Sequence, residues 1–301
     1  MSTPNGPLPL LDALTRQGVH AGKRASHARG YCAVGHFAPD AGAAAFAGAP
    51  LLRDGPLPMT VRFSVAGGDP HASEKTRSLR GMALRLHGVY ETYDIVLVSE
   101  PIFFAATPLS YLSYLEAHAA DPRTGVADPQ RLAAHAQRHP DTARLPALLA
   151  AHAAPASYAC TPYHSTHAFL FTGADGEARP ARIMAEPQAG TQYLSGAQER
   201  QLPDSFLERE MDERLLHGPI RFRLYAQRPA QGDPLDDPSM PWRGQDKVLL
   251  GSLVISALAD DSCDHMVFLP TRLPAGIAAS DDPILRARAA AYAAASLKRR
   301  R

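Results

Sequence analysis

The chain has 301 residues, of which 45% are hydrophobic and 20% are charged, which is enough apolar material to bury a core. Its 31 basic and 30 acidic residues leave a net charge of +1, which disfavours a protein that binds nucleic acid through the phosphates. No apolar run reaches the ~20 residues that cross a bilayer, and the N-terminus has no basic and apolar leader. We therefore expect a cytoplasmic protein with no nucleic-acid partner and no membrane span.

The metal-ligating side chains give weak signals. Cys32, Cys160 and Cys263 are odd in number and form no CxxC pair, so we predict neither a disulfide framework nor a cysteine-built zinc site. His135 and His139 have the i, i+4 spacing of a helical zinc pair, but the glutamate of the zinc-hydrolase motif is missing between them. We interpret both histidines as solvated.

The first half of the chain is predicted to consist mainly of strands. Residues 58–65 alternate apolar and polar side chains with a period of two, as in a strand with one buried face. Residues 81–87 and 94–98 are predicted as further short strands. Between residues 109 and 152, leucines at helical spacing predict two or three short helices.

Strands return in the second half. Residues 164–172 and 179–186 are predicted as two strands that flank a hairpin turn at residues 173–176. Ser205 and Glu208 form an S-x-x-E capping box, which predicts the start of a helix that ends at Gly218-Pro219. Further strands are predicted at residues 220–227 and 248–258.

The last element is a helix with clear boundary signals. Ser280-Asp-Asp-Pro283 offers capping acids and a proline at the first helical position, and an alanine-rich run then extends to Leu297. Many short strands with inserted and appended helices predict an α+β protein built on a closed antiparallel barrel. The lack of a clear linker predicts a single domain over residues 1–301.

Arg288 and Tyr292 lie four residues apart and share one face of this helix. A tyrosine on an inner helix face is most often a core residue. A guanidinium one turn away, however, favours the phenolate form of the tyrosine. A phenolate oxygen is a hard anionic ligand suited to ferric haem iron.

A second group of residues lies near the N-terminus. Arg24 and His27 precede the first strands, and Arg62 and Ser64 share one face of the strand predicted at 58–65. A histidine near a buried serine is what a peroxide-cleaving haem pocket needs, because the imidazole moves a proton between the two peroxide oxygens. Arginines in such a pocket bind the haem propionates as bidentate pairs.

Five collinear stretches resemble the haem catalases, and specifically their short relatives, the catalase-related peroxidases. They are Arg24-Ala-Ser-His-Ala-Arg-Gly30, Val61-Arg-Phe-Ser64, Arg80-Gly-Met-Ala-Leu-Arg85, Asp94-Ile-Val with Pro101-Ile-Phe-Phe104, and the run from Ala279 to Tyr292. The resemblance implies a catalase-like closed antiparallel β-barrel with inserted and C-terminal helices, and a haem b cofactor. It implies an N-terminal arm at 1–17, a haem-binding core at 18–297 and a basic tail at 298–301.

The resemblance also implies roles for single residues. His27 matches the distal acid–base, and Ser64 matches the serine that orients it. The implied haem-binding residues are Arg24, Arg62, Tyr111, Arg288 and Tyr292. Among these, Tyr292 matches the iron ligand, Arg288 lies beside it, and Tyr111 falls where the family usually has a phenylalanine stacked over the haem.

Two departures from the larger catalases bear on the expected activity. Val98 stands where those enzymes have an asparagine that hydrogen-bonds peroxide, and the chain ends nine residues after Tyr292. Both favour a peroxidase that reduces organic hydroperoxides and/or hydrogen peroxide with a small-molecule electron donor, with weak catalase activity. Two alternatives stay open: a haem hydroperoxide isomerase or dehydratase acting on fatty-acid hydroperoxides, and a haem-binding protein without turnover. Homo-oligomer formation also stays open.

Overall fold

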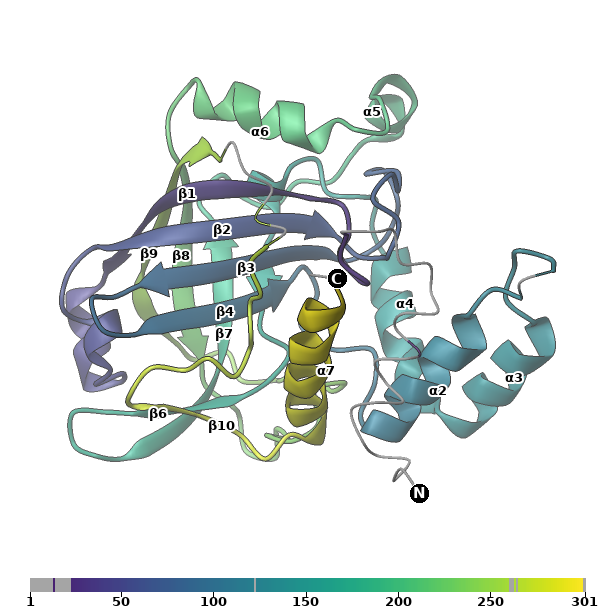
Figure 1. Cartoon of the computed structure of the whole chain (residues 1–301). Helices are drawn as coiled ribbons and strands as arrows, with labels where there is room; N and C mark the ends of the chain where they lie inside the picture. The colour runs from purple at the N-terminus through teal and green to yellow at the C-terminus, as the bar shows by residue number, and fades with distance from the viewer. Residues whose placement is uncertain (1–12, 14–22, 122, 260–262, 264, 300–301) are drawn as a thin grey trace.

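Eight antiparallel strands close into a barrel, because β7 pairs with β5 on one side and with β8 on the other (Figure 1). The protein is represented by a computed structural model, which describes residues 13, 23–121, 123–259, 263 and 265–299. The barrel strands are β1 (Gly30–Pro39), β2 (Leu57–Val65), β3 (Arg80–His87), β4 (Thr92–Val98), β5 (Tyr163–His164), β7 (Ala178–Pro187), β8 (Ile220–Gln227) and β9 (Lys247–Leu258). The predicted α+β architecture with a closed antiparallel barrel is confirmed.

Two shorter strands extend the sheet beyond the barrel. β6 (Phe169–Thr172) pairs with β7 across the predicted turn at residues 173–176, and β10 (Ile277–Ala279) pairs with β6. The strand predicted over residues 164–172 is interrupted, because Ser165 turns the chain between β5 and β6. Its hydroxyl donates a hydrogen bond to the carbonyl of His167 at 2.9 Å and accepts one from the backbone N–H of Ile183 at 2.8 Å.

The barrel interior is filled by the apolar side chains that the alternating pattern predicts. On β2, Met59, Val61 and Phe63 point inward and are almost fully buried. The outward-facing Arg62 and Ser64 are also buried, with 3% and 4% of their surface exposed. The prediction of a strand with only one buried face is therefore wrong at this end of β2, because other parts of the chain cover its outer face.

Between residues 23 and 299, the described α-helices occupy three places. α2 (Pro108–His118), α3 (Pro129–Arg138) and α4 (Arg144–Ala150) lie between β4 and β5, which agrees with the predicted helical region. α5 (Gly196–Gln201) and α6 (Leu207–Leu215) lie between β7 and β8, and α7 (Pro283–Arg299) ends the described chain. Figure 1 shows α6 across one end of the barrel, with α2 and α3 standing to one side of it beyond α7.

The start of α6 corrects a prediction. The residue before the helix is Phe206, and the expected capping box of Ser205 and Glu208 is not formed. The buried carboxylate of Glu74 instead accepts a hydrogen bond from the backbone N–H of Leu207 at 2.7 Å. An acceptor distant in sequence thus satisfies one of the free N–H groups at the helix start.

Several expectations concern residues outside the described ranges or stay untested. The predicted N-terminal arm at 1–17 lies outside the described residues except for Ala13, as do residues 300 and 301 of the predicted basic tail. None of the described helices is long and apolar enough to cross a membrane. The single-domain organisation stays a prediction.

Candidate active site

A row of four residues crosses the outer face of the barrel on neighbouring strands. Gly30 pairs with Ser64, Ser64 with Gly81, and Gly81 with Val98. Residues directly opposite in an antiparallel pair project on the same face. The row faces outward, since the adjacent Phe63 belongs to the barrel core. The register therefore brings Val98 onto the same face as Ser64.

His27 lies over this row, just before β1. A hydrogen bond of 2.9 Å joins its Nδ1 to Ser64 Oγ. Its backbone has φ = 55°, a left-handed conformation that is uncommon for a residue with a side chain. Gly81 provides the space for the ring, because a Cβ there would lie 2.6 Å from Ser64 Oγ and 2.9 Å from His27 Nδ1. The predicted His27–Ser64 pair is thus present in the structure.

His27 is surrounded by positive charge. Burial and then, in decreasing order of effect, Arg62, Arg288 and Arg24 together lower the pKa of this histidine to about 3. The imidazole is therefore neutral at neutral pH, with a nitrogen lone pair able to accept a proton. A neutral imidazole is the form that a general base requires.

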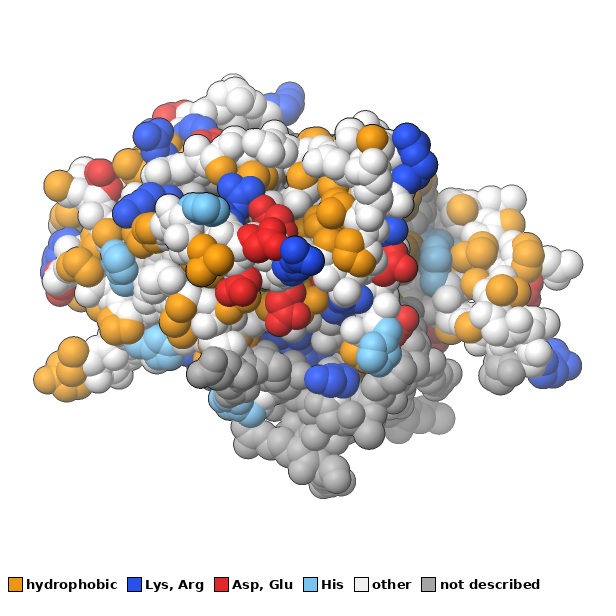
Figure 2. All heavy atoms as spheres, turned by 90° about the horizontal axis from the view of Figure 1, so that it is seen from above, with side chains coloured by type: hydrophobic (Ala, Val, Ile, Leu, Met, Phe, Trp, Pro, Cys, Tyr) orange, Lys and Arg blue, Asp and Glu red, His pale blue; other side chains and the backbone are white. Residues whose placement is uncertain are grey.

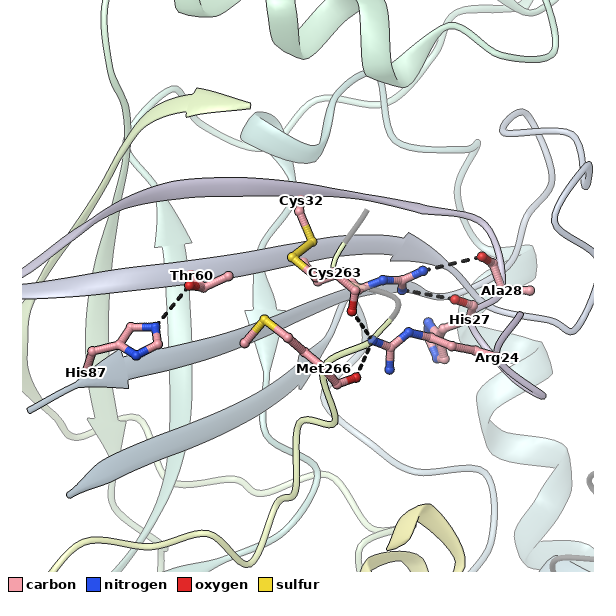
Figure 3. The surroundings of a disulfide bond; sticks show 9 residues. Arg24, His27, Ala28, Cys32, Thr60, His87, Cys263 and Met266 are labelled. Atoms are coloured by element: carbon pink, nitrogen blue, oxygen red, sulfur yellow. Dashed lines mark hydrogen bonds between the residues drawn. A yellow bond between two sulfur atoms is a disulfide. The ribbon is translucent and has the colours of Figure 1, made fainter. Parts of the chain in front are cut away.

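Arg62 and Arg24 both lie near His27 and donate hydrogen bonds to main-chain carbonyls (Figure 3). Arg62 donates hydrogen bonds to the carbonyls of His27 at 3.0 Å and Ala28 at 3.3 Å. Arg24 donates to the carbonyls of Cys263 at 2.9 Å and Met266 at 2.7 Å. Both predicted propionate-binding arginines therefore lie close to the histidine, and both support the main chain there.

A disulfide lies next to these arginines and corrects a prediction. Cys32 on β1 is bonded to Cys263, with the two Cα atoms 6.0 Å apart (Figure 3). Cys32 is paired with Arg62 in the β1–β2 register, so the disulfide attaches Cys263 beside the outer-face row. The expectation of no disulfide is wrong because the cysteines are 231 residues apart and no local motif links them.

The opposite group of site residues lies on α7 and the chain before β6. Arg288 Nη2 donates a hydrogen bond to the Tyr292 hydroxyl at 2.8 Å, as the i, i+4 spacing predicts. Arg288 is buried, with 7% of its surface exposed. Burial alone would lower the pKa of Arg288, but Tyr292 and Tyr111 together raise it above its usual value.

His167 and Asp282, which the sequence did not suggest as site residues, support Arg288 through hydrogen bonds. Arg288 Nη1 lies 2.7 Å from His167 Nε2, and His167 Nδ1 lies 2.5 Å from Asp282 Oδ2. Arginine only donates, so Nε2 of His167 must accept and its Nδ1–H must donate to Asp282. Burial lowers the pKa of His167 to about 4, which agrees with this neutral form. Asp282, Arg288 and Tyr292 are thereby connected through one oriented imidazole.

Asp282 also caps the start of α7. Because this cap already accounts for an acid at this position, the contact of Asp282 with His167 was missed. Asp282 Oδ1 accepts hydrogen bonds from the backbone N–H groups of Ile284 at 2.8 Å and Leu285 at 3.2 Å. The sequence predicts this capping contact correctly. The only signal of a further role is that two acids, Asp281 and Asp282, precede Pro283 where one cap suffices.

Tyr111 is buried beside the same group. Its ring lies edge-on to Phe103 and Phe104, with centroid separations of 5.2 and 4.9 Å. Burial raises the pKa of Tyr111, and the nearby Tyr292 raises it further. Tyr111 therefore lies near Tyr292, and the structure brings every predicted site residue into one region.

The histidines at zinc spacing have a structural explanation. His135 is buried and lies within 2.9 Å of both Ser113 Oγ and Thr142 Oγ1, so its interpretation as solvated is wrong. Its two nitrogens connect α2, α3 and the turn after α3. Among the residues that the structure describes, no group of three or more His, Cys, Asp or Glu side chains is arranged to hold a metal ion.

The residues present fit a haem. Tyr292 offers an oxygen ligand next to a guanidinium, and the buried Nε of Arg288 has no hydrogen-bond partner within the described chain. Arg288 is near enough to His27 to lower its pKa, so the two groups border a common region. A neutral acid–base and an anionic oxygen donor are the two functions that a peroxide-cleaving haem site needs from its protein.

Comparisons with known proteins point in the same direction. The family model described as Catalase matches residues 11–225. The chain is 35% identical over 285 residues to a catalase-related peroxidase of Mycolicibacterium paratuberculosis, covering 92% of this chain and 89% of that protein. It is 31% identical over 289 residues to a catalase-related peroxidase of Synechococcus elongatus, covering 94% and 85%. The structure of a bacterial catalase superposes with a TM-score of 0.83 at 20% identity, and this chain spans 59% of that catalase's length.

Proposed function

The chain belongs to the catalase family, and from this premise we propose that it is a haem b peroxidase. It reduces organic hydroperoxides, and hydrogen peroxide as well, at the expense of a small electron donor, with weak catalase activity. The observation that carries the proposal is the half-buried, neutral His27 in hydrogen-bond contact with Ser64. A protein that only carried haem would need no such proton acceptor.

The haem, when bound, supplies the iron at which the O–O bond of the peroxide breaks. Tyr292 is the proposed iron ligand, and Arg288 donates a hydrogen bond of 2.8 Å to its oxygen. Arg24 and Arg62 are proposed to bind the propionates together with Arg288, and Tyr111 to pack against the haem face. Bidentate arginine–carboxylate pairs suit this role, because they fix the carboxylate position as well as its charge.

His27 carries the proposed proton transfer. Its Nε2 would accept the proton of the peroxide and deliver it to the oxygen that leaves as the O–O bond breaks. The leaving group is then an alcohol or water, which is a far better leaving group than an alkoxide or hydroxide. Ser64 holds the ring by its Nδ1, so the other nitrogen, Nε2, is the one that faces the substrate.

Val98 favours peroxidase over catalase activity. It lies next to Gly81 on the outer-face row, and His27 lies over Gly81. An apolar side chain at this position gives no hydrogen bond to a second peroxide molecule, whereas it tolerates an alkyl substituent. One such bond contributes ~0.5–1.5 kcal/mol net, which corresponds to roughly tenfold in rate.

The surface charge and the disulfide bear on the partners and location proposed for this protein. Figure 2 shows acidic and basic side chains interspersed on the face that it views, which favours a small-molecule substrate over nucleic acid, whose binding needs a basic surface. A homo-oligomer stays a prediction. A cytoplasmic location also stays a prediction, and the Cys32–Cys263 disulfide weighs against it, because such bonds are typical of oxidising compartments.

The test compares two activities in the purified haem protein and in two variants of Val98. We expect measurable oxidation of a dye with cumene hydroperoxide and slow oxygen release from hydrogen peroxide. Val98→Asn should raise oxygen release by roughly tenfold, whereas Val98→Leu, which matches asparagine in size, should not. Oxygen release as fast as in a full-length catalase without dye oxidation would contradict the proposal. Consumption of a fatty-acid hydroperoxide without any donor would favour the isomerase or dehydratase.

A further inference from the structure

A continuous series of aromatic rings runs from the candidate site along α2 to the surface. Phe103 lies next to Arg288, whose Cζ is 4.8 Å from the Phe103 ring centroid and 5.4 Å from that of Tyr292. Phe104 follows, with its centroid 4.4 Å from Phe103 and 4.6 Å from Tyr114. Tyr114 then stacks on His118 at 3.9 Å. Separations of this size place consecutive rings in direct contact.

The spacing of the α2 residues explains this arrangement. Tyr111, Tyr114 and His118 are separated by three and four residues, so they share one face of the helix. Exposure increases along the face, because Tyr111 is buried, Tyr114 is half-buried and His118 is exposed. Figure 1 shows α2 beside α7, on the side away from the barrel.

Packing alone does not require these residue types. Leucine or phenylalanine would fill the same half-buried position of Tyr114, and the stacked His118 lies in solvent. Tyrosine differs from phenylalanine in being oxidisable by one electron when its phenolic proton can leave. Burial raises the pKa of Tyr114, which agrees with a neutral phenol in the resting protein.

We propose that Tyr114 is a surface redox site, connected to the haem region through Phe104 and Phe103, at which phenols or aromatic amines are oxidised. This inference rests on the proposed peroxidase function. Tyr114 gives one electron to the haem region and its phenolic proton to solvent, and becomes a neutral radical. A donor AH then returns one electron and one proton and leaves as A•. Two such cycles complete the reaction ROOH + 2 AH → ROH + H2O + 2 A•.

The site extends the range of donors. A donor that docks at the half-buried Tyr114 and the exposed His118 does not have to enter the region between His27 and Tyr292. The flat stacked pair suits an aromatic donor, because offset or edge-to-face contacts between rings are favourable. We therefore expect bulky aromatic donors to depend on Tyr114 more than small ones do.

The experiment traps the radical in the intact haem protein. The protein is treated with cumene hydroperoxide and a nitroso spin trap without any donor, and adducts are located by peptide mass spectrometry. We expect an adduct on Tyr114 that is lost in Tyr114→Phe and retained in Tyr90→Phe, which changes a fully exposed tyrosine in the turn between β3 and β4. Phenylalanine preserves the ring packing, so Tyr114→Phe should fold and bind haem as the parent does.

The absorption spectrum recorded in the same samples separates the two levels of failure. If the haem spectrum responds to cumene hydroperoxide but Tyr114 carries no adduct, the redox site is wrong and the peroxidase proposal stands. If the spectrum does not respond at all, both proposals fail, since no oxidant reaches Tyr114. Equal oxidation of a bulky phenol such as syringaldazine by the parent and Tyr114→Phe would also overturn the site.

Discussion

The two sides of the candidate site are built by different physical means. On the His27 side, strand register aligns Ser64, Gly81 and Val98 in one row. On the Tyr292 side, the side chains of Asp282, His167 and Arg288 form a chain of charged and polar hydrogen bonds. Backbone register tolerates side-chain substitution, whereas a buried hydrogen-bonded chain fails when one member is lost. Substitutions on the first side should therefore alter chemistry, and those on the second should alter haem retention and stability.

The largest effect is expected for His27→Ala. Loss of a positioned general acid–base costs ~10²–10⁴-fold in rate, while the barrel register that shapes the site stays intact. Stopped-flow mixing with hydrogen peroxide should show this loss at unchanged haem content. Ser64→Ala serves as the matched control and should cost far less, because it only frees the ring. Reaction of His27→Ala at the parent rate would remove His27 from the mechanism.

The disulfide adds a covalent restraint to the His27 side alone. Replacing Cys32 and Cys263 by serine should lower the free energy of unfolding by about 2–5 kcal/mol, with the Tyr292 side unaffected. Denaturant titration of both forms measures this difference. Thiol titration of the unfolded, unreduced parent should find only Cys160. Three reactive thiols would mean that the bond is absent.

On the Tyr292 side, replacing a single carboxylate oxygen by an amide nitrogen should disrupt the hydrogen bonds that support Arg288. Asp282→Asn preserves the cap of α7, because an asparagine oxygen also accepts from the helix N–H groups, but it places an amide N–H against His167 Nδ1–H. Loss of a buried hydrogen bond to a charged group costs about 1.5–3 kcal/mol. We expect weaker haem retention, measured by haem transfer to apomyoglobin. Retention equal to that of the parent would show that Arg288 needs no support from Asp282.

The stability of the fold at low pH depends on histidines of lowered pKa on both the His27 side and the Tyr292 side of the site. Burial lowers the pKa of His27 to about 3 and those of His164 and His167 to about 4, against 6.5 for an ordinary histidine. Between pH 6.5 and about 4 the unfolded chain binds more protons than the folded one, so stability is full above pH 6.5 and falls on acidification. Melting temperatures across this range should decline, and the decline should be shallower in His167→Gln. A flat profile would contradict the buried neutral histidines.

The sequence predicts the features of this protein that depend on near neighbours. The strand β2 with its inward Met59, Val61 and Phe63, and the i, i+4 contact of Arg288 and Tyr292, are local features, and both appear as expected. The burial of the outer face at the end of β2 depends on distant parts of the chain and was missed. The partners of His167 and Cys32 lie 115 and 231 residues away, and no periodic pattern records such contacts. The capping of α6 by Glu74, which crosses 133 residues, was missed for the same reason.

The most direct test of the two-sided account compares the haem content and absorption spectra of Tyr292→Phe and His27→Ala, purified side by side. Tyr292→Phe should lose most of its haem, because a phenyl ring offers no oxygen to the iron. His27→Ala should keep full haem occupancy and the parent's ferric spectrum. Full occupancy with an unchanged ferric spectrum in Tyr292→Phe would contradict the assignment of the Tyr292 side.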